Sequence, residues 1–273
     1  MGKIMSIDLA CSTRGLGICL LEPAPDTPLK VEFASPEHIG LHDPLFPTTV
    51  GEAIFGFCSR QAIPIVLIDG PQAWKDPDSE LAYCRRCEKK LNTPAKTGIV
   101  GNVKPATWTR FVEFSIAVFS RLVDLGRKLA ENPHPVAADG EVLVLESFPF
   151  SAWRKAGILP LPSKRKCRSE DLAQRLSELQ RLYRPIVATA PNHDELQALV
   201  AGLAGIAILD GNTSGYQLDG SPPICKNGVL VGGLHCESAE AEEHKPPPGS
   251  NRMKAVRFCT KTAEVEATHT TPN

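Results

Sequence analysis

Residues 3–22 read KIMSIDLACSTRGLGICLLE, and this stretch decides the fold class. Two apolar runs, residues 3–7 and 16–22, flank a short turn, which is the pattern of a β-hairpin. Asp8 stands at the end of the first run, although a carboxylate among Ile, Met and Leu is costly to remove from water. A metal ion, a Lys or Arg side chain, or simple exposure at the strand tip would each offset that cost.

The overall composition excludes several classes of protein. Thirty basic and 31 acidic residues give a formal net charge of −1, so binding to nucleic acid or to an anionic membrane needs a local basic patch. No apolar run is long enough to span a membrane, and Asp8 interrupts the first strand too early for a signal-peptide core. The nine cysteines are an odd number and fit reduced thiols better than a disulfide framework. We therefore expect a cytoplasmic protein that does not bind membranes.

Strands alternate with helices through the rest of the chain. After the antiparallel hairpin, this order predicts an α/β fold built on a mixed sheet. Apolar runs predict further strands at 31–33, 64–68 and 142–145 and a hairpin over 216–218 and 228–234, while helical periodicity predicts helices over 50–62 and 111–129 and others that start at the caps Ser169 and Asn192.

Two segments depart from this alternation. Residues 74–106 are polar and rich in Lys, Arg, Gly and Pro, which favours a functional loop or lid over a simple connection. The end of the chain turns acidic, then Pro-rich, then Thr-rich. This change predicts a folded domain at 1–236 and a poorly ordered tail at 237–273.

Acidic residues follow three of the predicted strands. Asp8, Asp69 and Glu146 stand at the carboxyl ends, where such sheets bind ligands, and Asp194 lies in the first turn of the last predicted helix. Carboxylates packed together repel one another, so a shared pocket requires cations, and oxygen ligands suit Mg²⁺ or Mn²⁺. We predict that all four residues bind metal and act in catalysis, with Asp8 bridging two ions. The alternative is that each acid is a solvated turn residue or a helix cap, and the helix dipole alone would explain Asp194.

Five motifs occur in a characteristic order: SIDLACSTRGLGICLL, IPIVLIDGP, YCRRCEKKL, LVLESFPFSAWRKAGI and HDELQALVAGLAG. In this order and spacing the chain resembles the family catalogued as domain of unknown function 429, which consists of predicted nucleases with a fold like that of ribonuclease H and Holliday-junction resolvases. The resemblance covers residues 3–235 and rests on the order of the motifs, because each motif is short. It implies a ribonuclease H-like fold and a nuclease that depends on a divalent metal ion.

The resemblance places the family's acidic positions on Asp8, Asp69, Glu146 and Asp194. One position departs from the family pattern, because the helix usually carries a second Asp where this chain has Gln197. Glutamine supplies one neutral oxygen and no charge, which weakens a metal site that depends on that acid. An active variant and a chain that has kept the fold but lost the chemistry are therefore both open.

Two basic segments are candidates for substrate binding. The resemblance places Arg85, Arg86 and Glu88 where the family has a basic and acidic pair, which implies that the segment holds cations over an anionic substrate. Arg154, Lys164 and Lys166 belong to the densest basic segment, and we predict that they bind phosphate. Solvated helix and loop faces explain these charges equally well.

Three further features each have a structural and a functional interpretation. Cys84 and Cys87 form a lone CxxC pair, whereas a zinc site needs two further ligands and the sequence has no second pair. Trp153 either stacks on a base or lies in the core. His193 is a general base, a metal ligand or a local hydrogen-bonding group, and its place in a first helical turn favours the local role.

The sequence thus predicts a phosphodiester hydrolase that depends on Mg²⁺ or Mn²⁺ and acts on nucleic acid, with DNA and RNA both open. The main alternative is a catalytically silent module that binds nucleic acid or protein in the same cleft, which Gln197 and the near-zero charge favour. A third interpretation is an ATP-binding relative of the actin-like and sugar-kinase folds. These folds also open with an Asp in the first hairpin, but this chain lacks a convincing second phosphate-binding loop.

Overall fold

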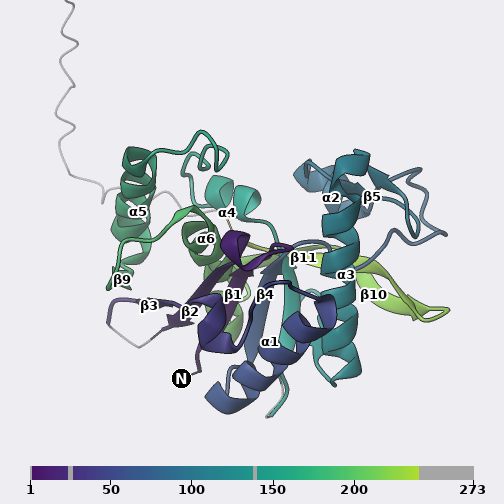
Figure 1. Ribbon diagram of the computed structural model, residues 1–273, viewed down its shortest axis with the longest axis horizontal. Helices are drawn as coiled ribbons and strands as arrows, with labels where there is room; N and C mark the ends of the chain where they lie inside the picture. Colours follow the sequence, from purple (N-terminus) through teal and green to yellow (C-terminus); the bar gives the residue numbers. More distant parts are fainter. Residues whose placement is uncertain (1, 24–26, 138–139, 240–273) are drawn as a thin grey trace, which may run out of the picture. The chain divides into compact units, whose positions relative to one another are not determined.

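The computed structural model describes residues 2–23, 27–137 and 140–239, which form a mixed sheet and its surrounding helices (Figure 1). The strands are β1 (Ile4–Asp8), β2 (Gly17–Glu22), β3 (Lys30–Phe33), β4 (Ile65–Asp69), β5 (Lys96–Thr97), β6 (Val103–Lys104), β7 (Lys128–Leu129), β8 (Leu143–Ser147), β9 (Ile186–Val187), β10 (Tyr216–Lys226) and β11 (Val229–Ser238). The α-helices are α1 (Pro47–Gln61), α2 (Arg86–Leu91), α3 (Thr109–Asp124), α4 (Pro149–Lys155), α5 (Ser169–Tyr183) and α6 (His193–Leu209). None of these helices is both long and apolar enough to cross a bilayer.

The large sheet has the order β10-β11-β8-β4-β1-β2-β3-β9, and β7 pairs with β8. The first two strands are antiparallel, while β4 runs parallel to β1 and β8 runs parallel to β4. The central order β3-β2-β1-β4-β8 with an opening antiparallel hairpin is that of a ribonuclease H-like fold. The predicted fold class is therefore confirmed.

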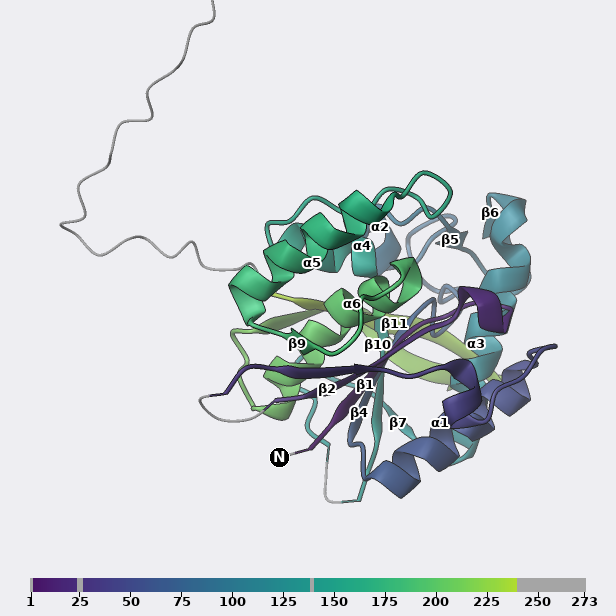
Figure 2. The same cartoon turned by 60° about the vertical axis from the view of Figure 1, so that its left-hand side comes forward.

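The central strands alternate their side chains between two cores, one on each face of the sheet. Ile4 and Leu67 pack into the core that includes α4, α5 and α6, whereas Met5, Val66 and Ile68 pack into the core that includes α1 and α3. Figure 2 shows these two groups of helices on opposite sides of the sheet. Because both faces are covered, each central strand is a continuous apolar run rather than an alternating one.

The helix after the long polar segment is shorter than predicted. The periodicity indicates a helix over 111–129, but α3 ends at Asp124. Gly126 takes a φ of +87°, which ends the helix, and Leu129 belongs to the short strand β7. The apolar spacing continues beyond the helix because Leu129 is also partly buried, so periodicity alone placed the boundary wrongly.

Two predicted helix starts have different outcomes. Ser169 is the first residue of α5 rather than its cap, and Asp171 accepts a hydrogen bond at 2.9 Å from the backbone N–H of the cap residue Arg168. At α6 the predicted capping box is confirmed. Asn192 accepts from the backbone N–H of Glu195 at 3.0 Å, and Glu195 accepts from the backbone N–H of Asn192 at 2.7 Å.

The long polar segment at 74–106 has structure of its own. It contains α2 and the two-stranded sheet formed by β5 and β6. Figure 1 shows this segment beside the upper end of α3, away from α5. The backbone N–H of Trp74 donates to the carbonyl oxygen of Leu230 at 2.9 Å, so the segment starts against β11.

The end of the folded part lies slightly beyond the predicted boundary at 236. Strand β11 continues to Ser238, and both Glu237 and Ser238 are buried. The remainder of the predicted tail, residues 240–273, lies outside the described residues.

Candidate active site

The carboxyl ends of three parallel strands meet at one cavity. In the strand pairing Asp8 stands opposite Asp69, and Glu146 stands opposite Ile68, the residue before Asp69. A cavity of about 980 Å³ lies over these strand ends, and all three carboxylates line it. The structure therefore brings the three strand-end acids to one place, as their positions in a parallel sheet require.

Asp8 and Asp69 form a pair of carboxyl groups that share a hydrogen bond. Burial raises the pKa of Asp69 to about 7, with a smaller increase from the charge of Glu146. Burial and the charge of Asp69 raise the pKa of Asp8 well above its usual value. Two carboxyl groups that share a hydrogen bond do not both ionise unless a cation binds between them. The pair therefore holds either a proton or a cation between its oxygens.

Glu146 lies in the same cavity but already has a cation. Arg85 donates from Nη2 to Oε1 of Glu146 at 2.7 Å and from Nη1 to Oε2 at 2.6 Å. The backbone N–H of Gln72 donates to Oε2 at 2.9 Å. This bidentate pair is the strongest geometry for a guanidinium and a carboxylate. The predicted role of Glu146 as a metal ligand stays a prediction, and these contacts do not favour it.

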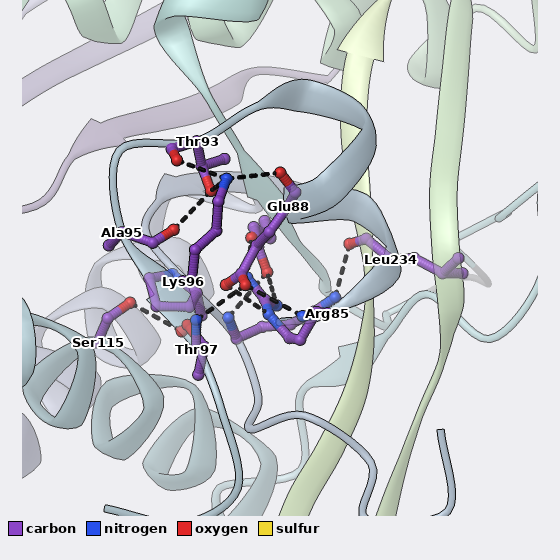
Figure 3. Close-up of polar contacts among 11 residues, drawn as sticks. Arg85, Glu88, Thr93, Ala95, Lys96, Thr97, Ser115 and Leu234 are labelled. Carbon is purple, nitrogen blue, oxygen red and sulfur yellow. Dashed lines mark hydrogen bonds and ion pairs between the residues drawn. The ribbon is translucent and has the colours of Figure 1, made fainter. Parts of the chain in front are cut away.

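Arg85 is fixed by a second carboxylate, Glu88, in the first turn of α2. Glu88 accepts from Nε of Arg85 at 3.0 Å, from the backbone N–H of Arg85 at 3.1 Å and from the backbone N–H of Thr97 at 2.8 Å (Figure 3). Arg85 is 4% exposed and Glu88 is 2% exposed. We call Glu146, Arg85 and Glu88 the arginine cluster; it is a buried ion-pair network within the chain.

His235 lies beside this cluster, because it pairs with Glu146 in the sheet. Burial, and after it the charge of Arg85, lower the pKa of His235 to about 3. The imidazole is therefore neutral at pH 7, and its Nε2 has no hydrogen-bond partner among the described residues. A single His in a predicted hairpin gave no signal for this position.

Asp194 lies close to Asp8 on the face of the sheet that α6 covers, and its charge contributes to the raised pKa of Asp8. A Cβ at Gly17, which pairs with Asp8, would lie 2.2 Å from the carbonyl oxygen of Asp194, so only glycine lets α6 come this close. Asp194 accepts from Nζ of Lys164, and its Oδ1 lies 3.1 Å from Nδ1 of His193. Burial raises the pKa of Asp194, but the hydrogen bonds to His193 and Lys164 outweigh it and lower the pKa below its usual value. Asp194 is outside the set of described residues that line the cavity.

Two arginines reach the cavity, Arg85 and Arg165. Arg165 belongs to the predicted basic segment and lies between Lys164 and Lys166 in the sequence. It is exposed, so its guanidinium is open to an anionic group that enters the cavity. Charge density in the sequence located the segment but did not distinguish which of its cations faces the site.

The other predicted substrate-binding cations lie elsewhere among the described residues. Arg86 is exposed and lines a separate polar cavity of about 520 Å³. The guanidinium of Arg154 lies 4.4 Å from the ring centroid of Phe150. Lys164 is paired with the carboxylate of the α6 acid, as described above, and Lys166 is exposed. Their predicted contacts with substrate remain predictions.

Aromatic rings form part of the cavity wall. The rings of Trp108 and Phe111 meet edge to face, with centroids 5.9 Å apart and an interplanar angle of 74°, and both residues line the cavity. A Cβ at Gly70, next to Asp69, would lie 3.2 Å from Cζ of Phe111, so this aromatic pair stands on the Asp69 side. Trp108 is 37% exposed. The sequence analysis missed Trp108 because it ends an irregular segment with no periodic pattern.

Trp153 belongs to the core and does not reach the cavity. It is fully buried, and its Nε1 donates to Oε1 of Gln197 at 2.6 Å. Gln197, which stands where the resembled family carries an acid, therefore serves as the hydrogen-bond partner of a core side chain. His193 is likewise local, because its Nε2 lies 3.1 Å from the carbonyl oxygen of Pro162.

Within the described residues, no group of three or more His, Cys, Asp and Glu side chains is arranged to hold a metal ion. Cys84 and Cys87 are buried, and burial raises the pKa of the Cys87 thiol to about 12. The four predicted carboxylates are likewise split among three environments: the Asp8 and Asp69 pair, the arginine cluster and the Lys164 ion pair. Of these three environments, the Asp8 and Asp69 pair is the one left to bind a metal ion.

Comparisons with known proteins add little to this geometry. No family model matches the chain, and no curated protein is similar to it in sequence. A Thermus thermophilus RuvC structure matches at 11% identity and a TM-score of 0.37, over 77% of this chain and 97% of that chain. T. thermophilus RuvC in complex with a Holliday junction substrate matches at 12% identity and a TM-score of 0.37, over 78% of this chain and 98% of that chain. The resemblance to domain of unknown function 429 stays a prediction.

Proposed function

We propose that Asp8 and Asp69 bind a divalent metal ion, Mg²⁺ or Mn²⁺, and that the chain hydrolyses phosphodiester bonds in nucleic acid. The observation that carries this proposal is the hydrogen-bonded pair of carboxyl groups on the cavity floor; Lys164, the cation whose charge acts on Asp8, makes its ion pair with Asp194 instead. Two carboxylates suffice, because Mg²⁺ is commonly bound through one or two carboxylates and otherwise by substrate phosphate and water.

The surrounding residues fit a nucleotide. The metal ion, when bound, would stabilise charge on a phosphoryl oxygen. Arg165 at the cavity offers a guanidinium for a neighbouring phosphate. Trp108 and Phe111 offer ring surfaces on which a base can stack, and every base has such a face. Together these groups favour a single strand or an unpaired end as the substrate.

A cleavage assay tests the proposal. The full chain is incubated with labelled single-stranded and duplex DNA and RNA in Mg²⁺, in Mn²⁺ or in a chelator. We expect cleavage with either metal, none with the chelator, and loss of cleavage in Asp8→Asn and Asp69→Asn. Asp124→Asn makes the same chemical change at an exposed position at the end of α3, and we expect it to retain activity. Equal cleavage by Asp8→Asn and the wild type would contradict the proposal.

A second candidate is a silent module that binds nucleic acid without cleaving it. Two ion pairs favour it, because Arg85 and Lys164 neutralise two of the four predicted carboxylates. Such a module would bind a single strand in the presence of chelator with equal affinity in the wild type and in Asp8→Asn. It would show no divalent-dependent turnover on any substrate of the assay.

A further inference from the structure

The cavity floor holds the Asp8 and Asp69 pair and, beside it, Glu146. Of these, Glu146 forms an ion pair with a cation of the chain, Arg85. Glu146 lies on β8, next to the strand that carries Asp69, and would be the third ligand of a two-ion centre. Its two oxygens instead accept three hydrogen bonds at 2.6, 2.7 and 2.9 Å from Arg85 and the backbone of Gln72. These donors occupy the side of Glu146 that a second metal ion would need.

We propose that Arg85 occupies the place of a second cation, so that this site takes one divalent ion at Asp8 and Asp69 and never a second at Glu146. This inference rests on the proposed function and specifies it. A guanidinium carries one fixed positive charge and does not exchange with solvent ions, so the second half of the centre is permanently filled. Arg85 and Glu146 then act as positioning residues on the cavity floor.

The surroundings of Arg85 hold it in this place. Its Nε is bound to Glu88, and Glu88 is held in turn by the backbone N–H of Thr97 at 2.8 Å. On the opposite side, a Cβ at Gly233 would lie 2.9 Å from Nη1 of Arg85, so β11 closes against the guanidinium. A metal ion at Glu146 would have to displace a buried arginine and break its hydrogen bonds to both Glu146 and Glu88.

The alternative is that the Arg85 side chain moves away from Glu146 when metal binds. Glu146 would then be free to bind a second ion, as the two-ion centre predicted from the sequence requires. The two arrangements differ in the number of ions bound and in their magnetic coupling. Two Mn²⁺ ions that share a bridging carboxylate lie roughly 3.5–4 Å apart and couple, whereas a single ion does not.

Mn²⁺ titration calorimetry and electron paramagnetic resonance of the full chain test this directly. We expect one Mn²⁺ per wild-type chain, an uncoupled spectrum, and loss of binding in Asp8→Asn. Two ions or a coupled spectrum in the wild type would overturn the inference and leave the proposed function standing. Absence of Asp8-dependent binding in the wild type would overturn both.

A matched pair of variants tests the role of Arg85 itself. Arg85→Ala opens the second place, so we expect a second Mn²⁺ and a coupled spectrum, and Arg85→Ala with Glu146→Gln should return to one ion. Arg86→Ala removes the neighbouring exposed arginine and should keep one ion. A folded Arg85→Ala chain that still binds only one ion would overturn the inference. If Arg85→Ala does not fold, the wild-type stoichiometry decides alone.

Discussion

The Asp8 and Asp69 pair and the arginine cluster lie in the same cavity, on neighbouring strands of the sheet. Their negative charges are compensated in different ways. Glu146 and Glu88 accept hydrogen bonds of 2.6 to 3.1 Å from Arg85, so one guanidinium offsets part of their combined negative charge within the chain. Asp8 and Asp69 share a hydrogen bond with each other, and the more distant charge of Lys164 only partly offsets the rise in the pKa of Asp8; burial raises the pKa of Asp69 to about 7.

This difference separates structure from chemistry on the cavity floor. A carboxylate that forms an ion pair with a buried arginine contributes to stability and positioning. Two buried carboxylates that have no cation between them destabilise the fold until a ligand binds. The comparison therefore predicts that disruption of the arginine cluster damages the fold, and that disruption of the Asp8 and Asp69 pair damages metal binding and relieves the fold.

The largest expected effect is that of Arg85→Ala on stability. Removing Arg85 leaves Glu146 and Glu88 buried without the guanidinium that they share, which typically costs about 3–5 kcal/mol for a buried pair. Urea unfolding in the absence of divalent ions measures this change. Arg86→Ala at the adjacent exposed position should stay within about 0.5 kcal/mol of the wild type. A change below about 1 kcal/mol for Arg85→Ala would break the comparison, because the cluster would then not be structural.

The next effect is the pH dependence of stability contributed by Asp69. Its pKa is near 3.8 in the unfolded chain and about 7 in the folded chain, so between these values the folded state binds more protons. This stability is therefore fully present below about pH 4 and is lost as the pH rises to 7, by at most about 4 kcal/mol.

Urea unfolding from pH 4.5 to 8 without divalent ions measures that loss. Asp69→Asn should reduce the pH dependence and leave the part that the buried Asp8 contributes, whereas Asp124→Asn, which changes an exposed acid, should retain the wild-type slope. Saturating Mn²⁺ should also flatten it, because the ion takes the place of the shared proton. A wild-type slope that survives Asp69→Asn would show that the pair is not the destabilising group.

Some residues of this comparison could be predicted from the sequence, and others could not. The acids at 8, 69 and 146 follow buried apolar runs, so strand polarity alone placed them at one edge. The partner of Glu146 was not accessible, because Arg85 reaches it across 61 residues and nothing in a local pattern encodes such a contact. The basic segment at 85–86 was recognised, but only packing separates Arg85, which is buried, from Arg86, which is exposed.

The same limit applies to the helix that carries Asp194. Its capping box was readable because all of its partners lie within four residues. The hydrogen bond between Gln197 and Trp153 spans 44 residues and became visible only in the folded chain. Short-range chemistry and apolar periodicity therefore predicted the frame of the site, while the pairing of its charges required the tertiary structure.

A smaller effect concerns the substrate on the Asp69 side of the cavity. Loss of one aromatic stacking surface typically costs about 1–3 kcal/mol of binding per base, and we expect this for Trp108→Ala with single-stranded DNA or RNA. Fluorescence anisotropy of a labelled strand measures it, in an Asp8→Asn background that prevents cleavage. Tyr83→Ala removes an aromatic ring that is 52% exposed and lies outside the described lining of the cavity, and should bind as the parent does. Equal weakening by both variants would remove the aromatic wall from the site.

The smallest effect sharpens the comparison by adding a third ion pair. Lys164 and Asp194 are paired like Arg85 and Glu146, but the Lys164 side chain is 52% exposed, so water and salt screen the interaction. We expect Lys164→Ala to change the free energy of unfolding by no more than about 1 kcal/mol. Because a hydrogen bond from Lys164 helps to lower the pKa of Asp194, that pKa should rise in the variant, as NMR titration would detect. A loss of stability equal to that of Arg85→Ala would show that burial does not decide which of these pairs is structural.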